Sequence, residues 1–203
     1  MQVLKAPNSA LRVRTKPVKK ITPALLQTFK DMVKLTKTYK DPEGVGLAST
    51  QIGLDRQYFV AKVGGSPRTR KQAGRSDTSD VEKAIHNEDT SDVDKPDKFI
   101  TVINPKITWT SKKTKKYFEG CLSVPNYWGE TERYIGIKVT YMDETGKIIK
   151  ANLKGVMAWI FQHEIDHLNG RLFMDRVLEQ KGKFYKNVGK DKTGADIFEE
   201  VTI

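Results

Sequence analysis

The sequence has few cysteine and histidine residues and no long apolar segment. It contains one cysteine, Cys121, and three histidines among 203 residues, which excludes an internal disulfide and leaves one thiol for metal binding or reaction. The alternative is that Cys121 is a buried structural thiol. No run of about 18 apolar residues could span a bilayer, and no N-terminal apolar stretch is typical of a secretory signal. The sequence therefore predicts a soluble, non-secreted protein with no membrane contact.

Acidic residues are scarce at the N-terminus. The formal net charge is +11, and the first 40 residues contain ten lysines and arginines against Asp31 as their one acidic residue. Such an excess attracts phosphate-rich surfaces over long range in a salt-dependent manner. A solvated basic face explains the charge equally well, so charge alone assigns no partner.

The length and the apolar content predict a single domain over residues 1–203. Hydrophobic residues make up 37% of the chain, which is enough for one sizeable core. Residues 64–98 differ from the rest, because polar and charged residues crowd together there. Such a segment buries too little apolar surface to order itself strongly. We therefore expect a polar, mobile insertion at about residues 65–98, in a connection between strands.

Apolar periodicity predicts an α+β fold. Thr22-Pro23 and the spacing that follows predict a helix over residues 23–39, and a second helix over 155–169 stops at Asn169-Gly170. β-Branched and aromatic residues predict strands. The expected strands cover residues 58–63, 99–110, 135–141, 147–153 and 197–203. We expect mainly antiparallel sheets packed around the second helix.

That second helix contains an HExxH motif. In His163-Glu164-Ile165-Asp166-His167 the two imidazoles lie one helical turn apart, close enough to bind one metal ion. Glu164 then lies beside the metal, where a general base works. A chance match on an ordinary helix is the alternative, but two of the three histidines fall in this motif, which favours the metal site.

A catalytic site of this kind needs a third protein ligand. The extended HExxHxxGxxH motif is excluded, because Phe173 occupies the position of its third histidine. Cys121 is the best candidate in the chain. An alternative is a zinc endopeptidase with Glu179 or a later carboxylate as third ligand, which would not need Cys121.

Three segments together resemble the motifs of peptide deformylases. They occur in the order and spacing of that family, and the similarity covers nearly the whole chain outside residues 65–98. The segments are Gly44-Val45-Gly46-Leu47-Ala48-Ser49-Thr50-Gln51, Glu119-Gly120-Cys121-Leu122-Ser123 and Gln162-His163-Glu164-Ile165-Asp166-His167.

The resemblance implies removal of the N-formyl group from the initiator methionine of nascent polypeptides, with release of formate. It implies a metal bound by Cys121, His163 and His167, with Fe²⁺ favoured and Zn²⁺, Ni²⁺ or Co²⁺ able to replace it. It further implies that Glu164 transfers protons and that the Gln51 amide and the Leu122 backbone N–H stabilise the oxyanion.

The resemblance also implies substrate contacts. Val45, Gly46 and Glu119 are expected at the formyl-methionyl peptide, with the first segment pairing with it as an added strand. The sequence departs from many relatives at residues 126–129, Asn-Tyr-Trp-Gly, where they carry charged residues, including an arginine, near the substrate backbone.

Cellular location and partners follow from the same reasoning. An enzyme that acts on nascent chains benefits from attraction to ribosomal RNA, which the basic N-terminal segment could supply. The absence of a leader before the family's usual start favours a bacterial-type cytoplasmic protein. The competing interpretation is a catalytically idle nucleic-acid-binding protein, which the intact Gln51, Glu164, His163 and His167 disfavour.

Overall fold

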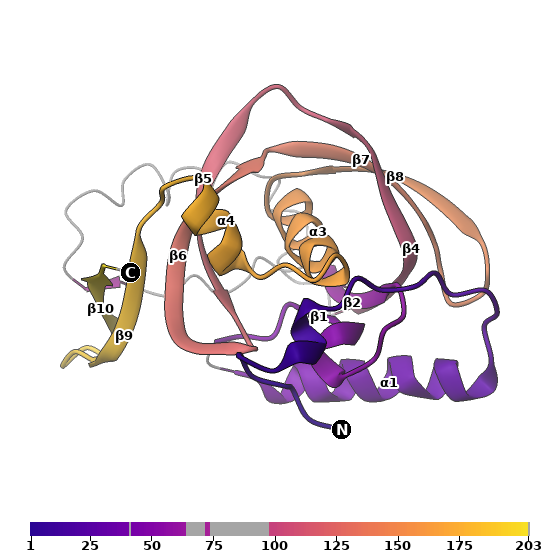
Figure 1. The fold of residues 1–203 in the computed structure, drawn as a ribbon, viewed down its shortest axis with the longest axis horizontal. Helices are drawn as coiled ribbons and strands as arrows, with labels where there is room; N and C mark the ends of the chain where they lie inside the picture. Colours follow the sequence, from indigo (N-terminus) through magenta and orange to yellow (C-terminus); the bar gives the residue numbers. More distant parts are fainter. Residues whose placement is uncertain (41, 64–71, 74–97, 203) are drawn as a thin grey trace.

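The computed structural model describes residues 1–40, 42–63, 72–73 and 98–202. These residues form two five-stranded sheets and three α-helices (Figure 1). All but one of the strand pairs are antiparallel. The arrangement is an α+β fold with mainly antiparallel sheets. Of the predicted insertion, Gln72–Ala73 and Lys98 are described, and the remainder lies outside the described residues.

The first sheet contains four of the predicted strands. Its order is β1-β2-β4-β7-β8, so the short strand β1 lies at one edge. The bounds are Gly46–Ala48 for β1, Tyr58–Val63 for β2, Lys98–Thr110 for β4, Gly136–Met142 for β7 and Ile148–Lys154 for β8. Predicted and observed ends agree to within one residue for β2, β4, β7 and β8. Strand β1 was not predicted, because three residues show no periodicity.

The second sheet was largely missed by the sequence prediction. Its order is β3-β10-β9-β6-β5. The bounds are Gln72–Ala73 for β3, Asp196–Val201 for β10, Phe184–Lys190 for β9, Val124–Tyr134 for β6 and Thr114–Cys121 for β5. Only the C-terminal strand β10 was expected. Lysines in β5 and Pro125, Asn126 and Gly129 in β6 are depleted in strands, and here the pairing of whole strands overrides that propensity.

The helices begin and end where local capping requires. Helix α1 spans Pro23–Thr38, and the hydroxyl oxygen of Thr22 accepts a hydrogen bond from the backbone N–H of Leu25 at 3.2 Å. Helix α3 spans Gly155–Leu168 and is followed by Gly170, whose φ of +73° suits glycine. Helix α4, Phe173–Glu179, was not predicted, because two turns are too short for a periodic signal.

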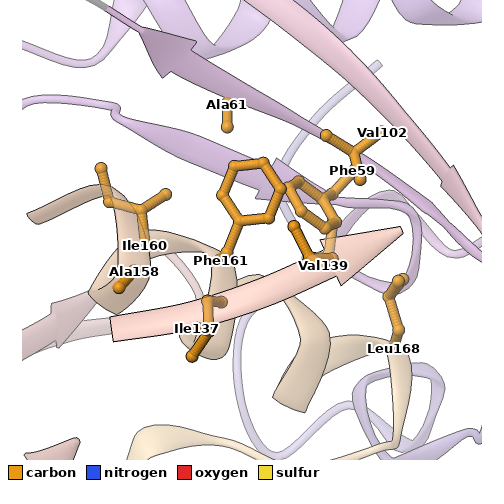
Figure 2. Close-up of a cluster of buried hydrophobic side chains, with 10 residues drawn as sticks. Phe59, Ala61, Val102, Ile137, Val139, Ala158, Ile160, Phe161 and Leu168 are labelled. Carbon is orange, nitrogen blue, oxygen red and sulfur yellow. The ribbon is translucent and has the colours of Figure 1, made fainter. Parts of the chain in front are cut away.

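Helix α3 packs on the first sheet through an apolar cluster (Figure 2). Phe161 of α3 is fully buried and meets Phe59 of β2 edge to face, with ring centroids 5.1 Å apart. Ile137 and Val139 of β7 complete the same cluster. This packing fixes the rotation of α3 about its axis. Among the described residues, no helix is long and apolar enough to cross a membrane.

Candidate metal centre and active site

Strand β5 and helix α3 meet through three successive pairs of side chains. Alternate residues of a strand share one face, and residues four apart share one face of a helix. The two periodicities coincide here, so a stacked aromatic pair, a hydrogen-bonded pair and a thiol–imidazole pair follow one another. The pairs are Tyr117 with Trp159, Glu119 with His163, and Cys121 with His167. This register brings a cysteine next to two histidines that lie far from it in the sequence.

Cys121, His163 and His167 form a compact donor set. One donor atom from each lies within 4.8 Å of the others, and Cys121 Sγ is 3.2 Å from His167 Nε2. The two imidazole rings are 5.0 Å apart at an interplanar angle of 78°. Cys121 and His167 are both buried. Thiolate and imidazole donors at this spacing fit a divalent transition metal with a fourth position open to another ligand.

The electrostatics of the donor set favour the thiolate. Burial alone would raise the pKa of the Cys121 thiol, but the His167 and His163 rings outweigh it and hold that pKa well below its usual range. Burial likewise opposes a charged His163, yet Cys121 and Glu119 raise the pKa of His163 well above its usual value. The thiolate is the form of cysteine that binds metal. The lowered pKa of Cys121 therefore agrees with the geometry, whereas His163 must give up its proton in order to bind a metal.

Glu164 is a buried carboxylate beside the donor set. Its side chain lies against Gly46 of β1, and within the described part of the chain its Oε2 is buried without a hydrogen-bond partner. Burial raises the pKa of Glu164 to about 7, against the opposing effect of His163 and His167. A carboxylate that gains and loses its proton near neutral pH can act as a general acid and base.

Gln51 is held with its amide N–H₂ toward the cysteine. It lies in a 3₁₀ turn, Ser49–Ile52, and its Oε1 accepts a hydrogen bond from the backbone N–H of Ala48 at 2.8 Å. Its Nε2 donates to Ser123 Oγ at 3.1 Å and lies 3.4 Å from Cys121 Sγ. The bond from Ala48 fixes which end of the amide faces the site. The two N–H groups of the amide thus face Ser123 and Cys121.

The remaining predicted site residues lie nearby. Leu122, next to Cys121, is half-buried, and its carbonyl accepts a hydrogen bond from the Lys5 ammonium. Val45 is half-buried, precedes β1 and packs against the apolar cluster of α3. Glu179, the alternative third ligand, ends α4 with a side chain that is 57% exposed and paired with Arg171. Cys121, not Glu179, belongs to the donor set.

A buried ion-pair network supports His163. Glu119 Oε2 is 2.9 Å from His163 Nδ1, and Arg133 holds both Glu119 oxygens at 2.7 and 2.9 Å. Arg133 also donates to Asp166, whose other oxygen accepts from Arg176 at 2.6 Å. Despite burial, the charge of Arg133 holds the pKa of Glu119 well below its usual range.

Glu119 was expected from the sequence as a substrate contact, whereas Arg133, Asp166 and Arg176 were not predicted as site residues. Asp166 occupies a variable position of the HExxH motif, and the two arginines come from β6 and α4, elements that were not predicted. The spacing of residues along the sequence does not reveal such contacts between separate elements. The network connects His163, one member of the donor set, to the second sheet and to α4.

Comparison with known proteins decides the family. The model of the polypeptide deformylase family matches residues 1–183. The chain belongs to the peptide deformylase family. It is 35% identical over 171 residues to the peptide deformylase of Thermotoga neapolitana, covering 84% of this chain and 83% of that protein.

Solved peptide deformylases share the fold. The crystal structure of the Thermotoga maritima enzyme matches with a TM-score of 0.66 and 32% identity, covering 86% of this chain and 95% of that one. An Acinetobacter baumannii peptide deformylase, crystallised with bound Met-Ala-Ser, matches with a TM-score of 0.65 and 27% identity over 87% of this chain and 97% of that one. The predicted family is therefore confirmed.

Family membership sets the activity. The chain is a hydrolase that removes the N-formyl group from nascent polypeptides, as the sequence predicted. Peptide deformylases depend on a metal, and the donor set of Cys121, His163 and His167 is a candidate site for it. The family acts on formyl-methionyl peptides.

Proposed function

We propose that Cys121, His163 and His167 hold the catalytic metal and that Glu164 moves the protons of the deformylation. The observation that carries this proposal is the buried Glu164 carboxylate, with one oxygen unpartnered among the described residues, next to three converging donor atoms. Helix α3 is then the central helix of the catalytic domain, since it supplies two ligands and the base.

A divalent metal in such a site activates water for attack on an amide carbon at neutral pH. Glu164 accepts the proton that this water loses and delivers it to the nitrogen of the departing amino terminus. Its pKa of about 7 suits both transfers. Because Glu164 is 3% exposed, bulk water competes little for its proton.

The oxyanion that forms at the formyl oxygen when its carbon is attacked needs donors already in place. We assign this role to the amide of Gln51 and to the backbone N–H of Leu122. Gln51 is 2% exposed and cannot turn its amide over without losing the bond from Ala48. Its donor is therefore preorganised for the transition state.

We propose that the peptide substrate pairs with β1 through Val45 and Gly46. Strand β1 is the edge strand of its sheet, and an edge presents backbone groups that an extended peptide can bind. Glu119, also expected at the substrate, is fully buried and bonded to Arg133, Thr131 and His163. Its contacts favour orientation of His163 over direct contact with the peptide.

The donor set accepts several metals. A thiolate and two imidazoles suit Fe²⁺, Zn²⁺, Ni²⁺ and Co²⁺. We propose Fe²⁺ as the native metal, following the family resemblance. Metal analysis of protein purified without oxygen, together with activity after reloading with each metal, tests this assignment.

We propose a bacterial-type cytoplasmic enzyme that approaches the ribosome through its basic N-terminal region. Lys30, Lys34 and Lys37 are exposed on α1, and Lys19 and Lys20 are exposed in the segment before it. This charge favours ribosomal RNA by long-range attraction. Cosedimentation with ribosomes should weaken as salt is added, and binding that is insensitive to salt would contradict the electrostatic form of the proposal.

The deciding experiment is formate release from formyl-Met-Ala-Ser. Protein with about one metal per chain should release formate, and a Cys121→Ala variant should bind no metal at this site and release none. An internally cleavable peptide with a blocked amino terminus serves as a control for endopeptidase activity. Cleavage of that peptide by the Cys121→Ala variant would support the alternative with another third ligand.

A further inference from the structure

A pocket of about 200 Å³ opens beside the metal ligand Cys121. Its wall includes Leu122 next to that ligand and three aromatic side chains, Tyr39, Tyr127 and Trp128. Pockets that enclose whole small molecules usually measure roughly 300–1,000 Å³. This one is smaller, so its size suits a single side chain of a bound peptide.

The C-terminal hairpin of β9 and β10 builds one side of this pocket. Strand β9 pairs with β6, placing Lys186 opposite Tyr127 and Tyr185 opposite Trp128. Asn187 of β9 lines the pocket, and its amide is held by Asp196 of β10 at 2.9 Å. The family match ends at residue 183, just before β9 begins. The hairpin is therefore a part of the pocket that the family match does not cover.

Trp128 is fixed in the wall from two sides. Its indole lies over Gly120, where an added Cβ would come within 2.8 Å of the ring. It stacks on Phe118 with centroids 5.4 Å apart and meets Phe198 of β10 edge to face at 5.8 Å. A rigid aromatic wall gives up little conformational entropy when a ligand binds to it.

Most of the described lining residues are apolar or aromatic, and Lys5, Asn126 and Asn187 are the polar ones among them. Pro42, Val124 and Pro125 join the three aromatic residues. The Lys5 ammonium is bonded to the Leu122 carbonyl and lies 5.5 Å from the Tyr39 ring centroid, so its charge already has partners on the pocket wall. Aromatic rings offset-stack or meet edge to face with such a surface.

The position of the pocket identifies which part of the peptide reaches it. Of the described residues that line it, none comes from β1 or α3, which carry Gly46 and Glu164. A formylated peptide continues from its methionine only in the C-terminal direction. With methionine placed along β1, the residues that follow are the ones free to turn toward β6 and β9.

We propose that Tyr127, Trp128 and the β9–β10 hairpin form a subsite that binds an aromatic side chain at the second or third position of the formyl-methionyl peptide. The inference rests on the proposed function, since it takes the donor set at Cys121 as the reacting centre. It makes the hairpin a specificity element for the residues that follow methionine.

The test compares metal-loaded, full-length protein on three peptides: formyl-Met-Ala-Ser, formyl-Met-Phe-Ser and formyl-Met-Ala-Phe. We expect kcat/KM to be on the order of tenfold higher for at least one phenylalanine peptide, as is usual for a matched apolar pocket. The Tyr127→Ala variant should lose most of that preference. Its side chain is 36% exposed, so truncation leaves the core intact.

Trp109→Ala is the matched control, because Trp109 is an exposed aromatic residue on β4, outside the pocket lining. It should keep the wild-type preference. A preference that is absent in the wild type, or unchanged by Tyr127→Ala, overturns the subsite. The subsite is also overturned if Tyr127→Ala changes activity only with peptides in which the methionine itself is replaced, because the pocket would then bind the first residue.

Binding of unformylated peptides separates the subsite from the chemistry. Calorimetric Kd values for Met-Phe-Ser, Met-Ala-Phe and Met-Ala-Ser should show the same order and the same loss in Tyr127→Ala. If no peptide releases formate, the proposed function fails, while the binding series still decides the subsite. Equal Kd values for all three peptides contradict it whatever the activity.

Discussion

The carboxylate of Glu164 lies against the backbone of Gly46. A Cβ built on Gly46 would overlap Glu164 Oε1 and approach its Cδ to 2.8 Å. Position 46 therefore needs glycine for a reason beyond substrate access, because any side chain there would displace the base. The family motif that contains Gly46 and the one that contains Glu164 are joined by this contact.

Replacing Gly46 with alanine should abolish most of the activity. A displacement of the base by about 1 Å can cost on the order of 10²-fold in rate, and we expect a loss of at least that size in kcat. The matched control is Gly136→Ala in β7, where an added Cβ meets nothing closer than 3.7 Å. Formate release and metal content are measured on both variants. A near-normal kcat in Gly46→Ala would contradict the need for glycine beside the base.

Glu164→Gln should keep the metal and lose turnover. Glutamine preserves the shape of the side chain but cannot accept a proton from water, and loss of a general base costs about 10²–10⁴-fold. Metal analysis and formate release on the same sample check this. Appreciable turnover with full metal content would remove Glu164 from the mechanism.

Gln51→Glu should lower kcat by about 10²–10³-fold, the usual cost of removing one oxyanion donor. Glutamate keeps an oxygen for the backbone N–H of Ala48, so the local turn survives, but it offers no N–H₂ to the oxyanion. KM should change much less than kcat, because the lost interaction belongs to the transition state. An effect confined to KM would point instead to ground-state binding.

Glu119→Gln should weaken metal binding by about 10–100-fold, the range seen when a group that orients a metal-binding histidine is lost. The change removes the charge that faces both Arg133 and His163. Competition with a chelator gives the metal Kd. Glu132→Gln is the control, since Glu132 is not among the groups that contact His163. An unchanged Kd would restrict Glu119 to a structural role.

Removing the metal should lower the thermal unfolding temperature. Cys121 belongs to the second sheet, whereas α3 packs on the first, so a metal bound to all three ligands links the two. A ligand present at 1,000 times its Kd stabilises the native state by about 4 kcal/mol. Calorimetry before and after chelation measures the change. Cys121→Ala should show little response to added metal, and an equal response would argue against the cysteine as a ligand.

Much of the first sheet and of the donor set follows from local sequence. The cap at Thr22, the stop at Asn169-Gly170 and the alternation in β7 and β8 are short-range signals with known physical causes. The HExxH spacing likewise places its two imidazoles through helix geometry alone. These features needed no knowledge of tertiary contacts.

The second sheet depends on contacts that local sequence does not report. Strand β5 contains Lys115 and Lys116, and β6 contains a proline and a glycine, so neither was predicted as a strand, although they pair over most of their length. Missing β6 hid Arg133, and missing the short helix α4 hid Arg176. The contact of Gly46 with Glu164 could not be predicted from local sequence either, because it depends on how β1 packs against α3.

Helix α3 is held by contacts on three of its sides. Phe161 faces the first sheet, His163 and His167 face β5, and Asp166 is bonded to Arg133 and Arg176. Rotation of the helix would break at least one of these contacts. The imidazoles are therefore oriented before any metal arrives, which keeps the conformational entropy lost on binding small. We therefore expect one divalent ion to be able to replace another without refolding of the helix, so that the supply of metal in the surrounding medium would decide which ion occupies the site.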